Sequence, residues 1–137
     1  MSAADDYNRK VIEEFRANDG KVGGTWEGRD LLLLTTTGRK SGREHTTPMV
    51  YTRDGDRLLV YASKAGAPAH PDWYLNLEAN PRVVVEVGPD RYEATATPLE
   101  GEERDREFAA QVERHPVFGE YQEKTGRIIP VVALAPV

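Results

Sequence analysis

Hydrophobic residues recur at helical spacing in the first part of the chain. Tyr7, Val11 and Phe15 repeat every four residues, with Ile12 beside them, and this pattern predicts an amphipathic helix over residues 5–18. A helix with one apolar stripe usually packs on the core of its own domain. A membrane surface is the second kind of partner for such a stripe, so we also expect that this helix could make peripheral membrane contact.

After residue 30 the pattern changes to short runs rich in aliphatic and β-branched residues. These runs predict about six strands, over residues 31–37, 45–52, 58–62, 83–87, 92–97 and 128–134. Between the second and third runs, Arg53–Asp56 contains an Asp-Gly pair, which is typical of a hairpin turn. Pro130 has no amide donor, so we expect the last strand to lie at a sheet edge or to contain a bulge.

Three further segments have the pattern of helices. They cover residues 73–79, 100–114 and 117–125, and Asp72 suits the N-cap of the first. Hairpins dominate the chain and no strand–helix–strand rhythm repeats, so a doubly wound parallel sheet is not expected. The sequence predicts an α+β, mainly β fold, in which about six antiparallel strands form a barrel with peripheral helices.

Length and composition exclude several classes of protein. A chain of 137 residues suits one domain, in which we expect residues 1–20 to form the N-terminal helix and residues 21–137 the barrel. Without cysteine there can be no disulfide, thiolate nucleophile or iron–sulfur cluster, and the three scattered histidines predict no metal site. No apolar run could cross a membrane and no signal-like leader opens the sequence, so we expect a cytoplasmic protein.

The charges of the chain are unevenly distributed. Eighteen Lys and Arg stand against 23 Asp and Glu, a net charge of −5 that argues against a nucleic-acid partner. Residues 37–43 nevertheless carry Arg39, Lys40 and Arg43 with no acid, and they include two glycines, Gly38 and Gly42. Such a turn can cradle an anion with backbone amides and cationic side chains. The alternative is an ordinary solvated hairpin tip.

Two other segments carry candidate chemistry. Ser63-Lys64-Ala65-Gly66 follows a predicted strand and could hold the polar edge of a planar ligand, or could simply end the strand. Trp73 and Tyr74 open a predicted helix and could form an apolar wall, or could belong to the core. No Gly-x-Ser-x-Gly sequence indicates a serine hydrolase.

Several motifs, taken together and in order, are characteristic of a known family. They are Leu-Thr-Thr-Thr-Gly-Arg-Lys-Ser-Gly (34–42), Thr47-Pro48, Ala62-Ser63-Lys64, Trp73-Tyr74-Leu75-Asn76-Leu77 with Asn80-Pro81, and Tyr121 followed by Arg127-Ile128-Ile129-Pro130. With these motifs the sequence resembles the deazaflavin-dependent nitroreductases, which use reduced coenzyme F420. The resemblance implies a split β-barrel, related to the folds of FMN-binding flavin reductases and pyridoxamine-phosphate oxidases.

The resemblance also implies a coenzyme site. The residues expected to bind coenzyme F420 are Arg39, Lys40, Ser41 and His45 at its anionic tail, Pro48, Met49 and Val50 against its ring, Ala62, Ser63 and Lys64 at the polar edge of the ring, and Trp73, Tyr74 and Asn76 closing the pocket. Phe118 and Tyr121 would form the acceptor pocket, and Tyr121 and Ser63 would act in catalysis.

The implied reaction passes a hydride from reduced coenzyme F420 to a quinone-like, enone or nitroaromatic acceptor. Phe118 stands where some nitroimidazole-reducing relatives have a tyrosine, which makes nitro reduction doubtful, and His45 replaces an arginine found in others. Two alternatives stay open: an FMN-dependent reductase on the same barrel, and a non-catalytic carrier of the coenzyme. The sequence does not define the oligomeric state.

Overall fold

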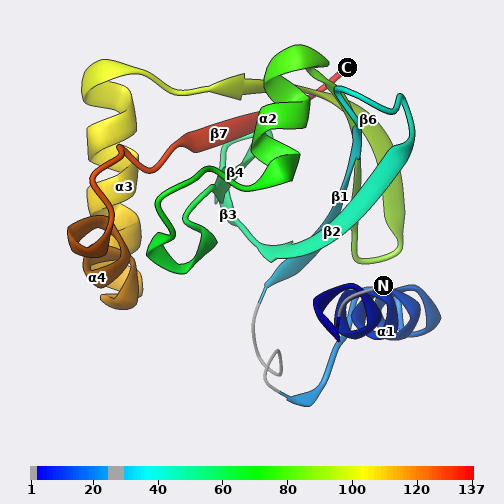
Figure 1. The fold of residues 1–137 in the computed structure, drawn as a ribbon. Coiled ribbons are helices and arrows are strands. Elements are labelled where there is room, and N and C mark those ends of the chain that lie inside the picture. Colours follow the sequence, from blue (N-terminus) through cyan, green and yellow to red (C-terminus); the bar gives the residue numbers. More distant parts are fainter. Residues whose placement is uncertain (1–2, 25–29) are drawn as a thin grey trace.

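A computed structural model describes residues 3–24 and 30–137 of the chain (Figure 1). The fold is one antiparallel sheet curled into a half-barrel, with helices around it. In chain order the elements are α1 (Ala3–Ala17), β1 (Leu31–Thr37), β2 (Glu44–Val50), β3 (Thr52–Asp54), β4 (Arg57–Tyr61), the 3-10 turn η2 (Lys64–Gly66), α2 (Asp72–Ala79), β5 (Arg82–Val87), β6 (Asp90–Pro98), α3 (Gly101–Arg114), α4 (Val117–Lys124) and β7 (Val131–Pro136).

The sheet has seven strands in the order β2-β1-β5-β6-β7-β4-β3, where about six were predicted. The difference arises because the predicted strand 45–52 is divided at Tyr51: the residues before it pair with β1, and those after it pair with β4. β2 and β3 are therefore joined by a single residue and yet form the two opposite edges of the sheet. This direct passage from one edge to the other curls the sheet, so the barrel predicted from the hairpins is confirmed.

The last strand differs from its prediction. β7 begins at Val131 rather than at residue 128 and lies inside the sheet, between β6 and β4. Of the two expectations drawn from Pro130, an edge strand or a bulge, the edge position was wrong. The preceding residues cannot join the ladder because side chains take their backbone groups: Gln122 accepts from the Ile129 amide at 3.1 Å, and Arg104 donates to the Ile129 carbonyl at 2.8 Å. Pro130 stands just before the ladder, where its missing donor costs nothing.

Helix α1 packs on the outer face of the barrel. Val11 and Phe15 are buried against Leu31 and Leu33, and the guanidinium of Arg16 donates to both carboxylate oxygens of Glu86 on β5. The apolar stripe of α1 therefore packs on the chain's own barrel. The structure gives no support to the membrane contact expected of this helix. Among the described residues, no helix is long and apolar enough to span a bilayer.

The strands bury both of their faces. Along β1, Leu32 and Leu34 point into the half-barrel while Leu31 and Leu33 face α1, as the two-residue period of a strand requires. On the outer face of β4, Leu59 and Tyr61 pack beneath α3 and α4. The leucine run of β1 is apolar throughout because helices and barrel interior cover its two sides.

Candidate functional site

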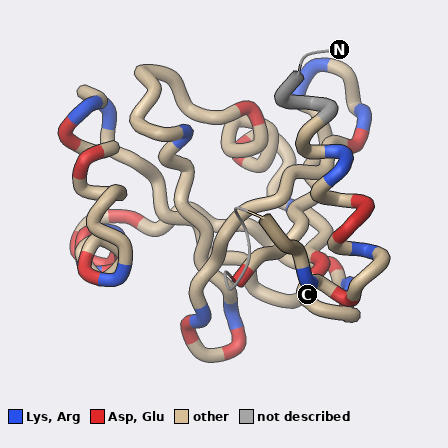
Figure 2. The backbone as a smooth tube through the Cα atoms, turned by 90° about the horizontal axis from the view of Figure 1, so that it is seen from below, with Lys and Arg blue, Asp and Glu red and all other residues tan. Residues whose placement is uncertain are grey.

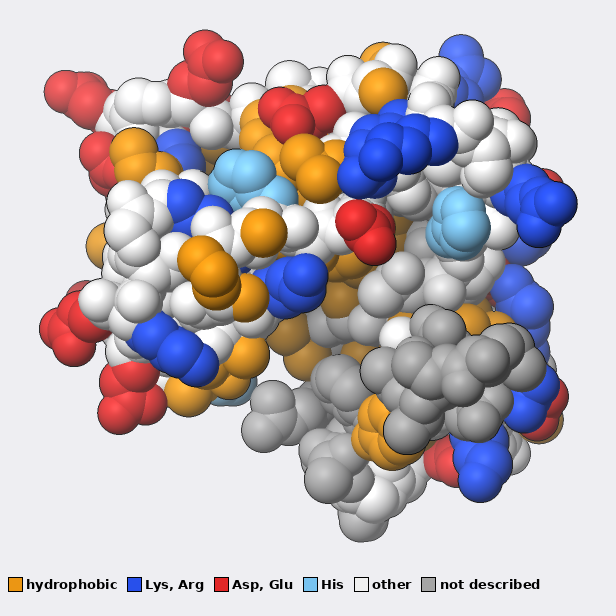
Figure 3. Space-filling view, in the orientation of Figure 1, with side chains coloured by type: hydrophobic (Ala, Val, Ile, Leu, Met, Phe, Trp, Pro, Cys, Tyr) orange, Lys and Arg blue, Asp and Glu red, His pale blue; other side chains and the backbone are white. Residues whose placement is uncertain are grey.

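A groove of about 890 Å³ opens where the basic turn, β2, the start of α2 and α1 meet. Figure 3 shows this face of the molecule hollowed near its centre, with basic side chains around the rim. Six of the predicted coenzyme-binding residues line the groove: Arg39, Lys40, Ser41, His45, Trp73 and Asn76. Although these residues come from separate segments of the chain, the fold brings all six around one groove.

The basic turn has a tightly defined backbone. The amide of Gly38 donates to the carbonyl of Arg43 at 2.7 Å, and the amide of Gly42 donates to the carbonyl of Gly38 at 2.9 Å. A Cβ on Gly38 would lie 2.6 Å from the Ser41 hydroxyl and 3.0 Å from His45 Nε2. A side chain at this position would displace the Ser41 hydroxyl or the His45 ring, so glycine lets both approach the backbone of the turn.

Arg39 is fixed by α2. The side-chain amide oxygen of buried Asn76 accepts from the Arg39 backbone amide at 3.1 Å and from the Arg39 guanidinium at 2.9 Å. A carboxylate oxygen of Asp72 lies 3.6 Å from the same guanidinium. Asn76 also donates to the Thr36 hydroxyl, at 3.4 Å. Asn76 therefore positions an arginine as well as lining the groove. Asp72, predicted to cap α2, instead lies in its first turn, because Pro71 holds the N-cap position.

The charges around the groove suit an anionic ligand. Arg9, Arg39 and Lys40 line it together with Glu44 and Asp72, and Lys40 is exposed and forms no ion pair with a described residue. Elsewhere acidic and basic positions are interspersed along the chain (Figure 2). The donor set of two arginines, a lysine, a hydroxyl and turn amides fits a phosphodiester with a carboxylate-rich tail.

The remaining predicted coenzyme contacts lie beside this groove or across the barrel. Met49 packs on the interior cluster that includes Ala62 and Tyr74, whereas Val50 points to the opposite side, toward α1 and α4. Pro48 is buried in the strand. Pro48, Met49 and Val50 were expected to lie together against one ring, but strand alternation gives Met49 and Val50 opposite faces.

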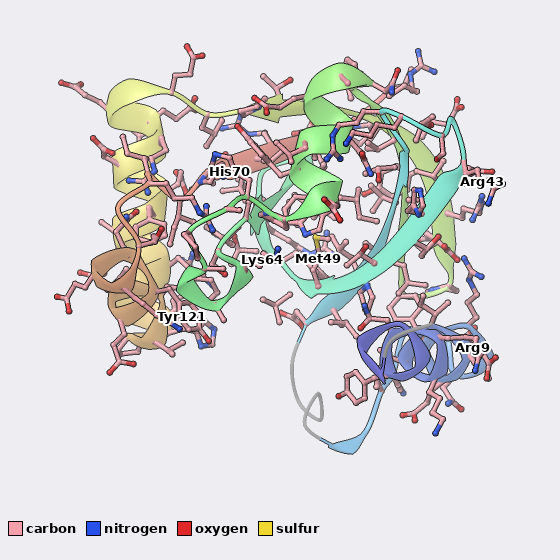
Figure 4. The ribbon with its side chains drawn as sticks, in the orientation of Figure 1. Arg9, Arg43, Met49, Lys64, His70 and Tyr121 are labelled. Carbon is pink, nitrogen blue, oxygen red and sulfur yellow. The ribbon has the colours of Figure 1, made fainter. Side chains whose placement is uncertain are left out.

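Ser63 and Lys64 begin the loop that joins β4 to α2, where Ser63 is half-buried and Lys64 exposed. Figure 4 shows Lys64 and Met49 both directed toward the hollow of the half-barrel. The loop docks on α4, since a Cβ on Gly66 would lie 2.9 Å from the carbonyl oxygen of Tyr121. The two predicted catalytic residues, Ser63 and Tyr121, thus come from segments that pack on each other.

A second groove, of about 660 Å³, lies where β2 bends into β3 beside the facing ends of α3 and α4. Val50, Tyr51, His115 and Phe118 contribute to its lining, together with Arg53 and Arg114 at its basic positions. Phe118, expected in the acceptor pocket, thus lines this second groove. Tyr121 lines neither groove: its ring packs against that of Phe118, with centroids 5.6 Å apart.

Burial alters the protonation of several groups. It raises the pKa of Tyr74 to about 12, with a further contribution from the charge of Glu78, and it raises the pKa of Tyr61. The Tyr61 hydroxyl is bonded to that of Thr52 at 2.7 Å and lies 3.4 Å from Arg114. Burial and the charge of Arg127 lower the pKa of His70. The phenols of Tyr61 and Tyr74 are therefore neutral over the physiological range.

Sequence reasoning missed two contributors to the site. Asn8, Arg9 and Ile12 of α1 line the first groove, and nothing in the sequence places this helix against the basic turn. Arg127 belongs to a quoted motif but was given no role, although its guanidinium contacts the loop that carries Ser63. Both roles depend on contacts between distant segments.

A curled antiparallel half-barrel with a cationic groove at its first hairpin is the architecture expected of a split-barrel reductase. The model of the F420H(2)-dependent quinone reductase family matches residues 7–136, and the chain therefore belongs to that family. The family resemblance, the enzyme class and coenzyme F420 as the hydride carrier are confirmed.

Individual proteins agree with this assignment. An F420H(2)-dependent quinone reductase of Mycobacterium tuberculosis is 41% identical over 124 residues, 88% of this chain and 83% of that protein. A solved F420-H2 dependent reductase, FDR-A, is 43% identical with a TM-score of 0.70 over 77% of this chain and 94% of that one. A solved structure described as a domain-swapped dimer is 38% identical, with a TM-score of 0.72 over 96% of this chain and 99% of that one.

Proposed function

We propose that the chain transfers a hydride from reduced coenzyme F420 to a quinone, holding the coenzyme tail in the first groove and the acceptor in the second. The observation that carries the proposal is the convergence of Arg39, Lys40, Ser41 and His45 on one groove. The coenzyme tail is long and polyanionic, and this groove offers several cationic donors along its length.

In this proposal, the residues of the chain bind the coenzyme and orient its ring. Arg39, kept in place by Asn76, offers the free part of its guanidinium fork to a phosphodiester, and Lys40 adds a point charge nearby. Met49 and Ala62 provide the apolar interior against which a ring can lie, while Ser63 and Lys64 stand at its polar edge. Trp73 and Tyr74 close the pocket from α2.

When bound, the reduced deazaflavin supplies the hydride. The protein's task is to bring the acceptor within reach and to keep water away from the transfer. The second groove suits a flat acceptor, because Val50 and Phe118 give it apolar walls. Reduction of a quinone by hydride also needs a proton. We propose that it comes from Ser63 or Tyr121, of which Tyr121 packs against Phe118 of the second groove.

Quinones suit this groove better than nitroaromatic compounds do. A phenyl ring at position 118 can pack against a flat acceptor but donates no proton, and the Tyr61 hydroxyl behind it is already bonded to Thr52. We propose quinone-like acceptors as the main substrates, enones as further ones, and nitroaromatics as poor ones. The carrier alternative predicts coenzyme binding without turnover of any of them.

Spectroscopic turnover assays test this function. Oxidation of the reduced coenzyme is followed with menadione, a nitroimidazole and an enone, and binding is measured separately for coenzyme F420 and FMN. We expect tight binding of coenzyme F420, weak binding of FMN, and turnover fastest with menadione. Binding of coenzyme F420 without any turnover would favour a carrier, and tighter binding of FMN would overturn the coenzyme assignment.

A further inference from the structure

The loop between β4 and α2 has a strained backbone at the point where it meets the proposed coenzyme site. Lys64 and Ala65 have φ angles of +46° and +53°, and Gly66 follows with +79°. Residues with a Cβ rarely adopt this left-handed region, so two of the three positions store strain. Such conformations persist only where surrounding contacts hold them in place.

Arg127 supplies those contacts. Its guanidinium donates to the carbonyl oxygens of Ala62 at 3.0 Å, Ser63 at 2.7 Å and Ala67 at 3.0 Å. The same side chain contacts Nδ1 of His70 at 3.0 Å. The three carbonyls flank the left-handed residues on both sides, so one side chain ties the two ends of the strained turn together.

The chemistry of arginine explains why this residue can do so. A guanidinium is a rigid plane with five N–H donors and no acceptor, so it can serve several carbonyls at fixed angles. An ammonium group has three donors around one nitrogen and cannot reach carbonyls this widely spaced. Because arginine can only donate, His70 Nδ1 accepts, which leaves the proton of the neutral ring on Nε2.

The segment that carries Arg127 is itself anchored. The side-chain amide of Gln122 donates to the Arg127 carbonyl at 2.7 Å, and Arg104 of α3 donates to both Gln122 and the Ile129 carbonyl. On the other side, Gly66 packs against the backbone of α4 at Tyr121. Arg127 thus links a fixed frame to the loop, and its position does not depend on a ligand.

We propose that Arg127 is a positioning residue for coenzyme binding: by tying the carbonyls of Ala62, Ser63 and Ala67 together, it holds the loop in the conformation that presents Ser63 and Lys64 to the deazaflavin. The inference rests on the proposed function for what the loop presents to the coenzyme. The clamp itself is a property of the chain alone, and it can be tested without coenzyme.

Amide exchange and histidine titration on the coenzyme-free protein form the first test. In Arg127→Gln the amides of Gly66 and Ala67, which donate to the carbonyls of Ser63 and Lys64, should exchange about ten-fold faster or more. Since Arg127 contributes to lowering the pKa of His70 in the native protein, that pKa should rise in the variant; Glu78 has the opposite influence and is unchanged. Arg82→Gln, which removes an exposed pair with Glu93, is the matched control and should change neither.

Coenzyme binding forms the second test. Arg127→Gln and Arg127→Lys should both weaken binding of coenzyme F420 by about ten-fold, while the KM for menadione stays within about two-fold of the wild-type value. Failure of the lysine variant to restore binding would show that the fork, rather than the charge, is needed. Ala65→Gly relieves strain at one left-handed position, so it should restore part of the affinity when added to Arg127→Gln.

The outcomes separate the two ideas. If the wild-type protein neither binds nor oxidises the reduced coenzyme, the proposed function fails while the exchange test still judges the clamp. If the wild-type protein is active and Arg127→Gln leaves loop exchange, the His70 pKa and coenzyme affinity unchanged, the positioning role is wrong. A variant that merely unfolds would lose protection throughout the sheet, and Arg127→Lys, which keeps the charge and the aliphatic stem but not the guanidinium fork, then decides between the two outcomes.

Discussion

Neighbouring cations of the basic turn stand in different surroundings. Arg39 is held by Asn76 and approached by Asp72, so part of its donor capacity serves the fold. Lys40 is exposed, lines the same groove and forms no ion pair with a described residue. A ligand in the groove would therefore meet the Arg39 guanidinium, which is held in place, and the exposed ammonium of Lys40. Lys40 is the residue whose removal tests electrostatic attraction alone.

We predict that Lys40→Ala weakens coenzyme binding at low salt by about 1 kcal/mol, roughly a five-fold rise in Kd, and by much less at high salt. Titration of the protein with the coenzyme at two ionic strengths measures both values. Lys21→Ala removes the same charge from the turn after α1, away from the groove lining, and serves as control. An equal loss at both ionic strengths would mean that Lys40 acts through something other than charge.

Tyr74 makes a prediction about alkaline pH. Burial raises its pKa to about 12 from the ordinary 10.0, so the folded protein keeps a proton that the unfolded chain releases first. Stability should therefore fall as pH rises from 10 towards 12, and Tyr74→Phe should make this decline shallower. Urea denaturation at a series of alkaline pH values measures the effect. Tyr61 and Tyr92, whose pKa values burial also raises, contribute to the decline in both proteins.

At the scale of elements, α1 is both a cover for the barrel and a wall of the first groove. Its apolar side contributes Phe15 to the cluster with Leu31 and Leu33, and Arg16 ties it to Glu86. Its other residues reach the groove through Asn8 and Ile12. The packing that stabilises the helix therefore also shapes the first groove.

Phe15→Ala is expected to lower the free energy of unfolding by about 3 kcal/mol, because the side chain is only 1% exposed and its removal leaves a cavity. Tyr7→Ala, on the same stripe but 47% exposed, should cost less than about 1 kcal/mol. Urea denaturation provides both values. Coenzyme affinity should fall in Phe15→Ala as well, since the groove loses support along one side. An unchanged stability of Phe15→Ala would contradict the docking of α1.

At the scale of the whole molecule, the net charge of the protein has the same sign as the charge of the coenzyme. A protein with a net charge of −5 repels a polyanionic coenzyme at long range, while the cations of the first groove attract it at short range. The two effects respond oppositely to salt. Screening of the net charge would strengthen binding, and screening of the groove would weaken it.

We expect the groove to dominate, so the affinity of the wild-type protein for coenzyme F420 should decrease as salt increases. Isothermal titration across an ionic-strength series measures the sign and slope of the effect. FMN, which carries a single phosphate and no polyglutamate tail, should show a smaller slope. Affinity that rises with salt would indicate that the tail does not lie among the groove's cations.

Local patterns were sufficient for most of the fold. The helical stripe of α1, the alternation along β5 and β6 and the hairpin at Gly55, whose φ is +64°, all depend on neighbouring residues and were predictable. The break at Tyr51 was not, because it is a change of partner strand, from β1 before Tyr51 to β4 after it. The interior position of β7 was also missed, since Gln122 and Arg104 set where its ladder begins.

The candidate site, too, was only partly predictable from the sequence. Residue types alone singled out Arg39, Lys40 and Ser41, since three cations and two glycines within seven residues, with no acid among them, are unusual on an acidic chain. They could not reveal that Asn76 orients Arg39, that α1 completes the groove, or that Met49 and Val50 face opposite ways. Each of these depends on which distant segments meet.

By itself, the sequence determined the kinds of element, the antiparallel barrel and the presence of a basic turn, because periodicity, turn chemistry and charge are written in consecutive residues. Tertiary structure alone decided the order of the strands, the two separate grooves and the clamp of Arg127 on the loop after β4. These features arise from contacts between residues far apart in the chain, whose partners are chosen by packing of the whole sheet rather than by local preference.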